Sequence, residues 1–243
     1  MEIAGASVLV TGGGTGLGRA IVEELAARGA RVALTFFSSG SVAQDVVAAV
    51  ERAGGEAVAI RADVTVIAEV ETAIHAAVER FGGLDALVNN AGTTRWIPMD
   101  ELESAGDDAW QLLLDVNLVG AFRCVRAAAA HLRRGGGSIL NVASNSAFSG
   151  SGSSIPYVVS KAGLVSLTQV LARVLAPEVR VNAIAPGWMD TEWLPRHIPP
   201  DVTENLRREQ PFVEVADVAK IGVDLLANDA ATGQTVVLDR GEW

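Results

Sequence analysis

The chain has 243 residues, of which 49% are hydrophobic, and its formal net charge at pH 7 is −10. A chain of this length buries roughly 70–75% of its unfolded surface, so it needs no disulfide or metal to complete a core. The acidic balance argues against nucleic-acid binding, which depends on basic residues that neutralise phosphates. Cys124 is the single cysteine, which excludes an intrachain disulfide and a cysteine-based zinc site and favours a reducing, cytoplasmic compartment.

Targeting and metal-binding patterns are absent from the sequence. Residues 1–5 do not begin a signal peptide, and no stretch approaches the eighteen or more apolar residues of a membrane span, so no membrane association is expected. The histidines His75, His131 and His197 lack the spacing of a metal motif, so we predict no metal site and assign them to helix surfaces or loops.

Short β-branched runs alternate with longer Ala-, Leu- and Val-rich stretches along the chain. The short runs predict strands at Ser7–Thr11, Arg31–Phe36, Glu56–Ile60, Leu84–Asn89, Ser138–Ala143, Val179–Ile184 and Thr235–Leu238. The longer stretches predict helices at Gly16–Arg28, Val42–Ala53, Val66–Phe81, Asp108–Arg134, Tyr157–Leu175 and Val215–Leu226. This alternation predicts an α/β fold, a parallel sheet with helices on both faces, in one domain over residues 1–243.

The least regular region is the segment 187–211, which contains four prolines and two tryptophans. It follows a predicted strand end, where ligand loops of such sheets lie, so we expect a substrate loop. Its tryptophans either cover an apolar substrate or fill core or subunit contacts, and the sequence leaves both open. The candidate substrate residues of the whole chain are Arg95, Trp96, Asn145, Ser146, Trp188 and Trp193.

A glycine-rich turn connects the first predicted strand to the first predicted helix. Glycines permit a tight turn and close approach of a pyrophosphate, which a helix N-terminus favours electrostatically. The strict G-x-G-x-x-G spacing is absent, and Arg19 after the last glycine excludes a P-loop. A turn without ligand, or a methyltransferase, would also fit the glycines alone. We predict that the cofactor contacts here are made by Gly12, Thr15, Gly16, Leu17 and Gly18.

The end of the second predicted strand bears on the choice of cofactor. An NAD site usually has an acidic residue there, which holds the ribose hydroxyls. The chain instead has Phe36 and Phe37 followed by Ser38 and Ser39, and the next acid is Asp45. No carboxylate would repel a 2′-phosphate and the two hydroxyls could bind it, so NADP is favoured over NAD, although no arginine occupies this turn.

Tyr157 and Lys161 stand four residues apart, so on a helix they are neighbours on one face. A tyrosine has an ordinary pKa of about 10. We expect the nearby ammonium to lower the pKa of Tyr157, which would suit the phenol to donate a proton to a carbonyl or to accept one from an alcohol. An isolated pair of this kind would more often be an ordinary surface contact.

Other polar residues lie at the ends of predicted strands and could belong to the same site as this pair. Ser144 ends the fifth strand and Ser146 lies close by, and the residues alone do not separate them as partners of a substrate oxygen. Asp63 follows the third strand and the run 89–92, Asn-Asn-Ala-Gly, closes the fourth, both at carboxyl ends where ligands gather. Asn117 lies mid-helix, where an asparagine is locally unfavourable. Taken together, these positions predict a site.

The chain resembles the short-chain dehydrogenase/reductase family over essentially its whole length. The resemblance implies a Rossmann-type, doubly wound, seven-stranded sheet in the order 3-2-1-4-5-6-7. The matching motifs are Thr11-Gly12-x-x-x-Gly16-x-Gly18, Asp63-Val64, Asn89-Asn90-Ala91-Gly92, Asn117, Ser144, Tyr157-x-x-x-Lys161 and Pro186-Gly187.

The resemblance also implies a role for each matching residue. Ser144, favoured over Ser146 by the family's spacing, would position the carbonyl, and Tyr157 would donate the proton. Lys161 would bind the nicotinamide ribose and tune Tyr157, while Asn117 would support a proton-relay water. Further cofactor contacts would come from Asp63 at the adenine, from Val64, Asn89, Ala91, Gly92, Pro186 and Gly187, and from Met189 and Thr191 at the carboxamide.

In overall character the chain is most similar to 3-oxoacyl carrier-protein reductases, with two departures. NADP-preferring members often have an arginine at the position of Thr15 or after the second strand, and this chain has neither. A carrier-protein partner is possible because Arg173 fits the basic surface that such members use, but Ala130 takes the place of the second basic residue. The family further implies a homotetramer or homodimer.

Three functions are compatible with these observations. The first is NAD(P)H-dependent reduction of a small-molecule ketone or 3-oxoacyl substrate to a secondary alcohol. The second is dehydrogenation of an alcohol, polyol or sugar by the same residues. The third is a non-catalytic NADP-sensing protein, although such proteins commonly lose the catalytic side chains that this chain retains at Ser144, Tyr157 and Lys161.

Overall fold

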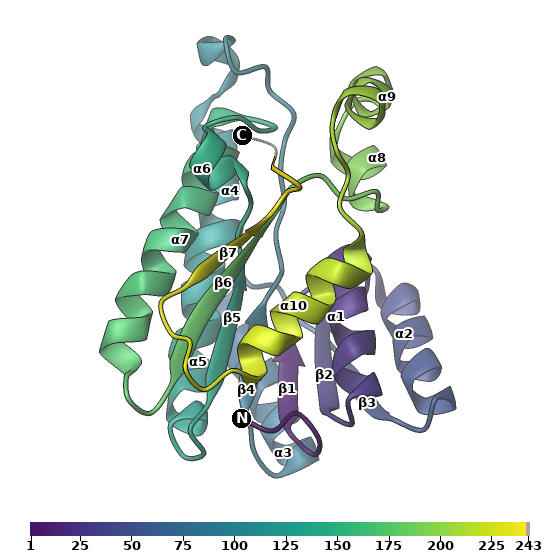
Figure 1. Ribbon diagram of the computed structural model, residues 1–243, viewed down its shortest axis with the longest axis vertical. Coiled ribbons are helices and arrows are strands. Elements are labelled where there is room, and N and C mark those ends of the chain that lie inside the picture. Colours follow the sequence, from purple (N-terminus) through teal and green to yellow (C-terminus); the bar gives the residue numbers. More distant parts are fainter. Residues whose placement is uncertain (242–243) are drawn as a thin grey trace.

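Seven parallel strands form the centre of the molecule (Figure 1), a computed structural model that describes residues 1–241. Their order across the sheet is β3-β2-β1-β4-β5-β6-β7, which confirms the predicted fold class and strand order. In Figure 1 the chain enters β1 at the lower end of the sheet and leaves β7 at the upper end, where the carboxyl ends of the strands lie. The strands are β1 (Ser7–Val10), β2 (Arg31–Phe36), β3 (Glu56–Arg61), β4 (Ala86–Asn89), β5 (Ser138–Val142), β6 (Arg180–Pro186) and β7 (Thr235–Leu238).

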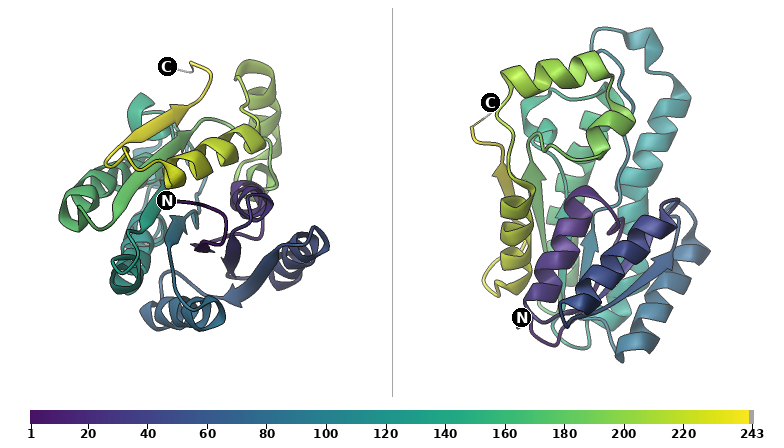
Figure 2. Two further views of the ribbon diagram at one scale, coloured as in Figure 1. Left: turned by 60° about the horizontal axis from the view of Figure 1, so that its bottom comes forward. Right: turned by 90° about the vertical axis from the view of Figure 1, so that its right-hand side faces the viewer.

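Helices cover both faces of this sheet (Figures 1 and 2). One face carries α1 (Gly16–Ala27), α2 (Gly40–Arg52) and α10 (Val215–Ala227). The other face carries α3 (Ile67–Phe81), α4 (Asp107–Leu114), α5 (Ala121–Leu132) and α7 (Ile155–Leu175). Two shorter elements, η1 (Leu102–Ser104) and α6 (Ser146–Ser149), lie in the loops that follow β4 and β5.

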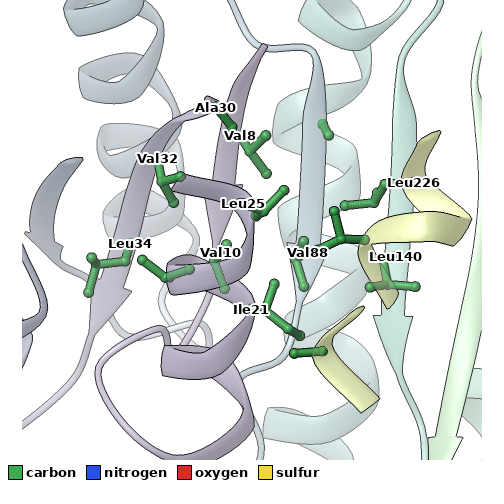
Figure 3. Packing of buried hydrophobic residues seen from close by; sticks show 14 of the residues in the cluster. Val8, Val10, Ile21, Leu25, Ala30, Val32, Leu34, Val88, Leu140 and Leu226 are labelled. Carbon is green, nitrogen blue, oxygen red and sulfur yellow. The ribbon is translucent and has the colours of Figure 1, made fainter. Parts of the chain in front are cut away.

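The core is divided into two layers by the alternation of side chains along each strand. In β1, Val8 and Val10 belong to the layer under α1, α2 and α10, whereas Leu9 belongs to the layer under α3, α5 and α7. Figure 3 shows Val8 and Val10 of β1 beside Ile21 of α1, with Leu140 of β5 in the same layer. Both faces of the central strands β1, β4 and β5 are buried, and most of their residues are apolar, as is typical of parallel sheets.

The predicted helix over Asp108–Arg134 is interrupted in the structure. It consists of α4, a π-helical turn η2 (Asp115–Gly120) and α5. The periodicity of apolar residues continues through the turn, which is why the sequence predicted a single helix. Such turns add one residue to the helical ladder and are frequent at functional sites, and this one contains Asn117.

The segment 187–211 is more regular than predicted. It contains α8 (Trp193–His197) and α9 (Pro200–Glu209), which stand above the carboxyl ends of the strands, apart from the flanking helices (Figure 2). Prolines suggested irregular structure, but Pro200 begins α9 and Pro195 lies in the first turn of α8, positions where a helix does not need the missing N–H.

Helix α7 corrects the expectation that no stretch is apolar enough to cross a membrane. Among the described residues it is the one helix that meets that test, by length and composition alone. One such helix is weak grounds for a membrane span, because the core helix of a sheet protein passes the same test. The residues Leu164, Thr168 and Leu171 on this helix are buried, and the helix packs against β6.

We expect Leu140→Ala to lower the free energy of unfolding by about 2–5 kcal/mol, because it leaves a cavity in a fully buried position of β5. Chemical denaturation monitored by circular dichroism measures this change. Leu102→Ala is the matched control, since Leu102 is 68% exposed and its truncation should change stability by less than about 0.5 kcal/mol. Equal effects of the two variants would contradict the described core.

Candidate active site

A cavity of about 590 Å³ lies at the carboxyl edge of the sheet. Its wall is formed by the β1–α1 turn, the ends of β2 to β6, the start of α7 and helix α8. Most of the predicted site residues line it, including every predicted residue of the glycine turn and all three of Ser144, Tyr157 and Lys161. Among the described residues, the predicted ones that do not line the cavity are Ser39, Asn89, Arg95, Trp96 and Asn117.

The glycine turn is closed so tightly that side chains cannot enter it. A Cβ atom on Gly18 would lie 2.2 Å from the carbonyl oxygen of Gly12, and Gly12 itself has a φ of +63°. The side-chain amide of Asn90 donates hydrogen bonds to the carbonyl oxygens of Thr11 and Gly12, at 2.9 and 3.0 Å. Asn90, to which the sequence analysis gave no role of its own within the run 89–92, therefore ties the turn to the loop after β4.

Thr11 completes this connection between β1 and β4. Its hydroxyl accepts hydrogen bonds from the backbone N–H groups of Asn90 and Ala91, both at 3.0 Å, and donates to the carbonyl oxygen of Val88 at 3.2 Å. Across the cavity, a Cβ atom on Gly16 would lie 3.6 Å from the side chain of Thr191. The absence of side chains on Gly12, Gly16 and Gly18 thus leaves a backbone-lined cradle between α1 and the loop after β6.

An arginine that the sequence analysis missed lies next to the end of the cavity near β2 and β3, outside the cavity lining. The guanidinium of Arg61, the last residue of β3, lies 5.9 Å from the ring centroid of Phe37, which lines the cavity beside Ser38. Arg61 also donates to Glu69 at 3.1 Å. The arginine expected after β2 in NADP-preferring relatives is absent, but the pairing of β2 with β3 brings Arg61 to the same edge. The proximity of Arg61 to the end of β2 follows from the pairing of the two strands and cannot be read from the local sequence.

Asp63 is held at that end by a local turn. Its carboxylate accepts hydrogen bonds from the backbone N–H and the hydroxyl of Thr65, at 2.8 and 2.7 Å. Its own N–H donates to the carboxylate of Glu69 at 2.9 Å. Asp63 and Val64 line the cavity as predicted, whereas Ser39 does not line it and immediately precedes α2.

Tyr157 and Lys161 lie on the first turns of α7, as their spacing predicted. The helix begins there because the hydroxyl of Ser154 caps the N–H of Tyr157 and Pro156 suits a first helical turn. Lys161 is only 5% exposed, and its ammonium donates to the carbonyl oxygen of Val142 at 2.8 Å. The same nitrogen lies 5.9 Å from the centroid of the Tyr157 ring.

Burial dominates the acid–base properties of this pair. It raises the pKa of Tyr157 to about 12, although a hydrogen bond with Ser144 acts in the opposite direction. Burial also lowers the pKa of Lys161 to about 8. The expectation that the ammonium would leave Tyr157 with a lowered pKa was therefore wrong: exclusion of water outweighs the favourable contacts, and the phenol is protonated near neutral pH.

The structure separates the two serines that the residues alone left open. The hydroxyl of Ser144 bonds with Tyr157 and also accepts the N–H of Ser146 at 3.2 Å. Within residues 1–241, the hydroxyl of Ser146 is buried and has no hydrogen-bond partner. Ser144, and not Ser146, is therefore the serine that shares the cavity wall with the phenol in direct contact.

Asn117 lies behind the cavity wall and joins two of its parts. Its side chain accepts the N–H of Thr93 at 2.9 Å and donates to the carbonyl oxygen of Thr93 and the hydroxyl of Ser160, both at 3.0 Å. The hydroxyl of Ser160 in turn donates to the carbonyl oxygen of Tyr157 at 2.7 Å. From the π-helical turn, Asn117 thus contacts both the loop after β4 and α7. The sequence analysis predicted a regular helix here and did not predict these two contacts.

Asn89 lies deeper in the molecule than predicted. It is 4% exposed, and its amide donates to Asn141 of β5 at 2.9 Å. The amide of Asn141 donates to the hydroxyl of Thr168 on α7, also at 2.9 Å. This chain of polar groups crosses from β4 through β5 to α7 beneath the site. Neither Asn141 nor Thr168 was identified from sequence, because each lies within an otherwise apolar element.

Helix α8 forms the remaining wall through a series of aromatic rings. The Trp193 ring centroid lies 6.3 Å from that of Tyr157 and 4.9 Å from that of His197. Trp188 and Asn145 also line the cavity, whereas Arg95 pairs with Asp108 on the exposed surface and Trp96 lies outside the lining.

His197 was expected at a surface or in a loop, but it lies half-buried against this cavity. Its four-residue spacing from Trp193 would have been a signal if a helix had been predicted there.

Among residues 1–241, no group of three or more His, Cys, Asp or Glu side chains could hold a metal ion. The reactive side chains at the site are a phenol, a hydroxyl and an ammonium, which lie beside the backbone-lined cradle. These groups can bind an elongated ligand along the strand ends and transfer a proton at Tyr157.

Burial disfavours the Lys161 ammonium, so replacing it with an uncharged side chain should stabilise the fold. Lys161→Met also loses the hydrogen bond to Val142, which costs about 1 kcal/mol. We expect the net result to be a free energy of unfolding at pH 7 that is about 1–2 kcal/mol higher than that of wild type. Between the folded pKa of about 8 and the unfolded value of about 10.4, the unfolded wild type binds more protons, so its stability rises with pH. The advantage of the variant should therefore shrink across this window. Denaturation at pH 7 and at pH 10 measures both effects, and a less stable variant at pH 7 would contradict the cost of burial.

Comparisons with known proteins identify relatives over the whole length of the chain. Residues 6–201 match the family model described as short chain dehydrogenase. A protein of Streptomyces violaceoruber, named as a ketoacyl reductase of the granaticin polyketide synthase, is 37% identical over 238 residues, which cover 96% of this chain and 94% of the relative. The 3-oxoacyl-(acyl-carrier-protein) reductase FabG of Staphylococcus aureus is 36% identical over 245 residues, 98% of each chain.

Solved structures agree with this relationship. A short chain dehydrogenase from Burkholderia cenocepacia, crystallised in complex with NADP, superposes with a TM-score of 0.89 at 35% identity and covers 99% of both chains. A dehydrogenase/reductase from Sinorhizobium meliloti gives a TM-score of 0.89 at 38% identity, over 99% of this chain and 96% of that one. The matched sequence, the strand order and the cavity agree, so the chain belongs to the short-chain dehydrogenase/reductase family and is an NAD(P)-dependent oxidoreductase.

Proposed function

We propose that the protein uses NADPH to reduce the ketone of a 3-oxoacyl or similar apolar substrate to a secondary alcohol. The observation that carries this proposal is the contact between the Tyr157 phenol and the Ser144 hydroxyl in the wall of a cavity that also contains the glycine cradle. The proposed proton donor therefore lies in the wall of the same cavity that would hold the dinucleotide. Lys161 lies beside the phenol and completes the set.

The residues present fit a nicotinamide dinucleotide. The cradle at Gly12, Gly16 and Gly18 leaves backbone at the N-terminus of α1, where a pyrophosphate is favoured. A Cβ atom on Gly92 would lie 3.6 Å from the Lys161 nitrogen, so the bare backbone there leaves room for a ribose beside the ammonium. When bound, NADPH supplies the hydride that reduces the carbonyl carbon.

NADPH is favoured over NADH by the charges at the β2–β3 end. No carboxylate follows β2 directly, and Ser38 lines this end of the cavity. Arg61 lies beside Phe37 just outside the lining, where it pairs with Glu69, and would reach a 2′-phosphate from there. A guanidinium binds phosphate through charge-assisted hydrogen bonds. The Burkholderia cenocepacia relative crystallised with NADP agrees with this preference.

The proton is supplied by Tyr157 in this proposal. The Ser144 hydroxyl and the Tyr157 phenol would both donate hydrogen bonds to the substrate carbonyl, and the phenol would transfer its proton as the oxygen becomes an alkoxide. The buried Lys161 ammonium stabilises the phenolate that this transfer leaves. Asn117 holds Thr93 and Ser160 in place behind these groups, and its part in a proton-relay water stays a prediction from the family.

Reduction is proposed over alcohol oxidation because the relatives are named as reductases and because the protonated phenol of Tyr157 is the form from which reduction starts. Oxidation requires the phenol to act as a base and therefore to lose its proton first, whereas burial raises the pKa of Tyr157 to about 12. Reduction starts from the protonated phenol, which is the state present near neutral pH. The oxidative alternative from the sequence thus has less support than the reductive one.

The substrate class is proposed from the lining of the cavity and from the relatives. Trp188, Trp193 and Leu194 offer an apolar surface beside Tyr157, which suits an acyl chain. The relatives named as 3-oxoacyl reductases act on carrier-protein thioesters according to their names. We include a carrier protein as a candidate source of the substrate, and the cytoplasm as the expected location.

The expected homotetramer or homodimer is also kept as a proposal. Exposed apolar side chains on η2, α5 and α7, namely Val119, Phe122, Val170 and Val174, support self-association through these helices.

The direct test is a steady-state screen of NADPH against NADH with ketones, 3-oxoacyl thioesters and sugars. We expect NADPH to be preferred in kcat/KM by about tenfold or more, because one charge-assisted hydrogen bond to the 2′-phosphate is worth on the order of 1.5–3 kcal/mol. Arg61→Gln should narrow this preference. The proposal fails if calorimetry detects binding of neither cofactor.

We expect Tyr157→Phe to reduce kcat by about 10²- to 10⁴-fold, the usual contribution of a positioned general acid. The ring remains and only the hydroxyl is removed, so the affinity for NADPH should stay within about twofold of wild type. Stopped-flow kinetics and fluorescence titration measure the two quantities. Full activity in this variant would assign the proton transfer to another group.

A further inference from the structure

The charges that line the cavity are divided between its two ends. Among the described lining residues, Asp63 is the single carboxylate, and it lies at the end formed by β2 and β3. Beyond Tyr157, the opposite end is lined by Arg196 and His197 of α8 and by no acidic side chain in the described range. The substrate end therefore has an excess of positive charge, although the whole chain has a formal charge of −10.

Within residues 1–241, Arg196 forms no salt bridge with a carboxylate. Arg95 and Arg207, in contrast, pair with Asp108 and Asp190. Glu192 stands one helical turn before Arg196 and would be the natural partner on a helix. It instead contributes to the electrostatic environment of Arg19 on α1, away from the substrate end.

His197, the neighbour of Arg196 on α8, is anchored close to Tyr157. Its ring lies tilted against that of Trp193, with the centroids 4.9 Å apart, and is hydrogen-bonded to the backbone of Thr94. The Trp193 ring centroid lies 6.3 Å from that of Tyr157. Burial lowers the pKa of the His197 imidazole, and the positive charge of the neighbouring Arg196 lowers it further. Arg196 therefore lies next to the anchored His197 in sequence and lines the same cavity as the phenol, with its side chain exposed to solvent.

We propose that Arg196 binds an anionic group carried by the substrate at a distance from the reacting ketone. This proposal rests on the reduction proposed above, and it assigns the substrate class more narrowly: a 3-oxoacyl compound with one negative charge remote from C3. Two sources have this chemistry. One is a phosphate on the thiol arm of a thioester, and the other is a carboxylate at the far end of the acyl chain.

The test compares substrates that differ by one charge. S-acetoacetyl-4′-phosphopantetheine is compared with S-acetoacetyl-pantetheine, and the N-acetylcysteamine thioester of 3-oxoadipate with that of 3-oxohexanoate. We expect wild type to prefer the anionic member of one pair by about five- to tenfold in kcat/KM, the range of a partly exposed charge-assisted contact. The preference should weaken as ionic strength rises. The pair that shows it identifies the source of the charge.

Two variants separate Arg196 from general effects of charge. Arg196→Gln should reduce the preference to within about twofold, mainly through a higher KM of the anionic thioester, whose kcat/KM should fall by more than that of its neutral partner. Arg208→Gln is the matched control, because Arg208 lies on α9, bonds to Asn205 and does not line the cavity. It removes the same charge from the same region and should retain the preference.

A binding measurement keeps this inference separate from the proposed function. Calorimetric titration with 4′-phosphopantetheine, pantetheine, adipate and hexanoate needs no turnover, and Arg196→Gln should weaken only the anionic ligand that wild type prefers. If neutral and anionic thioesters are all inert, the proposed reduction fails while the titration still tests Arg196. If wild type distinguishes neither pair, in kinetics or in binding, or if Arg196→Gln keeps the full preference, the inference is overturned.

Discussion

The site depends on one buried ammonium. Lys161 is charged at neutral pH although it is almost fully enclosed, and within the described chain its hydrogen bond goes to the carbonyl oxygen of Val142 and not to a carboxylate. Such a group is unfavourable for folding, since it has left water without an opposite charge to replace it. It therefore requires a rigid surrounding, which β5 provides through Val142 and α7 provides through its own backbone. Tyr157 shares that helix and so is fixed by the same contacts.

Rigid polar contacts around this ammonium connect elements that are far apart in sequence. Asn90 joins the glycine turn to the β4 loop, Asn117 joins that loop to α7, and Asn141 joins β4 and α7 through β5. Asn117 and Asn141 use both ends of their amides, whereas Asn90 donates both of its hydrogen bonds from the amide nitrogen. Because buried amides are costly when unpaired, these contacts specify one arrangement of the loops. The cradle and Tyr157 therefore belong to one connected framework.

The sequence predicted the parts of this framework that depend on local patterns. Strand order, the glycine turn and the Tyr157–Lys161 neighbourhood follow from periodicity, spacing and the family resemblance. The sequence did not reveal Arg61 or Asn141, because their partners lie on adjacent strands and pairing is a tertiary property. It also missed the raised pKa of Tyr157, since burial is set by surrounding side chains from several elements. Proline content hid α8, and with it the place of His197.

Helix α8 differs from the rest of the site in how it is supported. The residues around Tyr157 are anchored to strands of the sheet, whereas α8 is a five-residue element between loops that contributes Trp193, Leu194 and Arg196 to the cavity. Its sequence can therefore change without altering the strands that support the site, although Trp193 itself lies against the Tyr157 ring. Changes confined to this short segment can alter which substrates fit the cavity, while the residues on the sheet and on α7 stay the same. In this arrangement, selectivity evolves separately from catalysis.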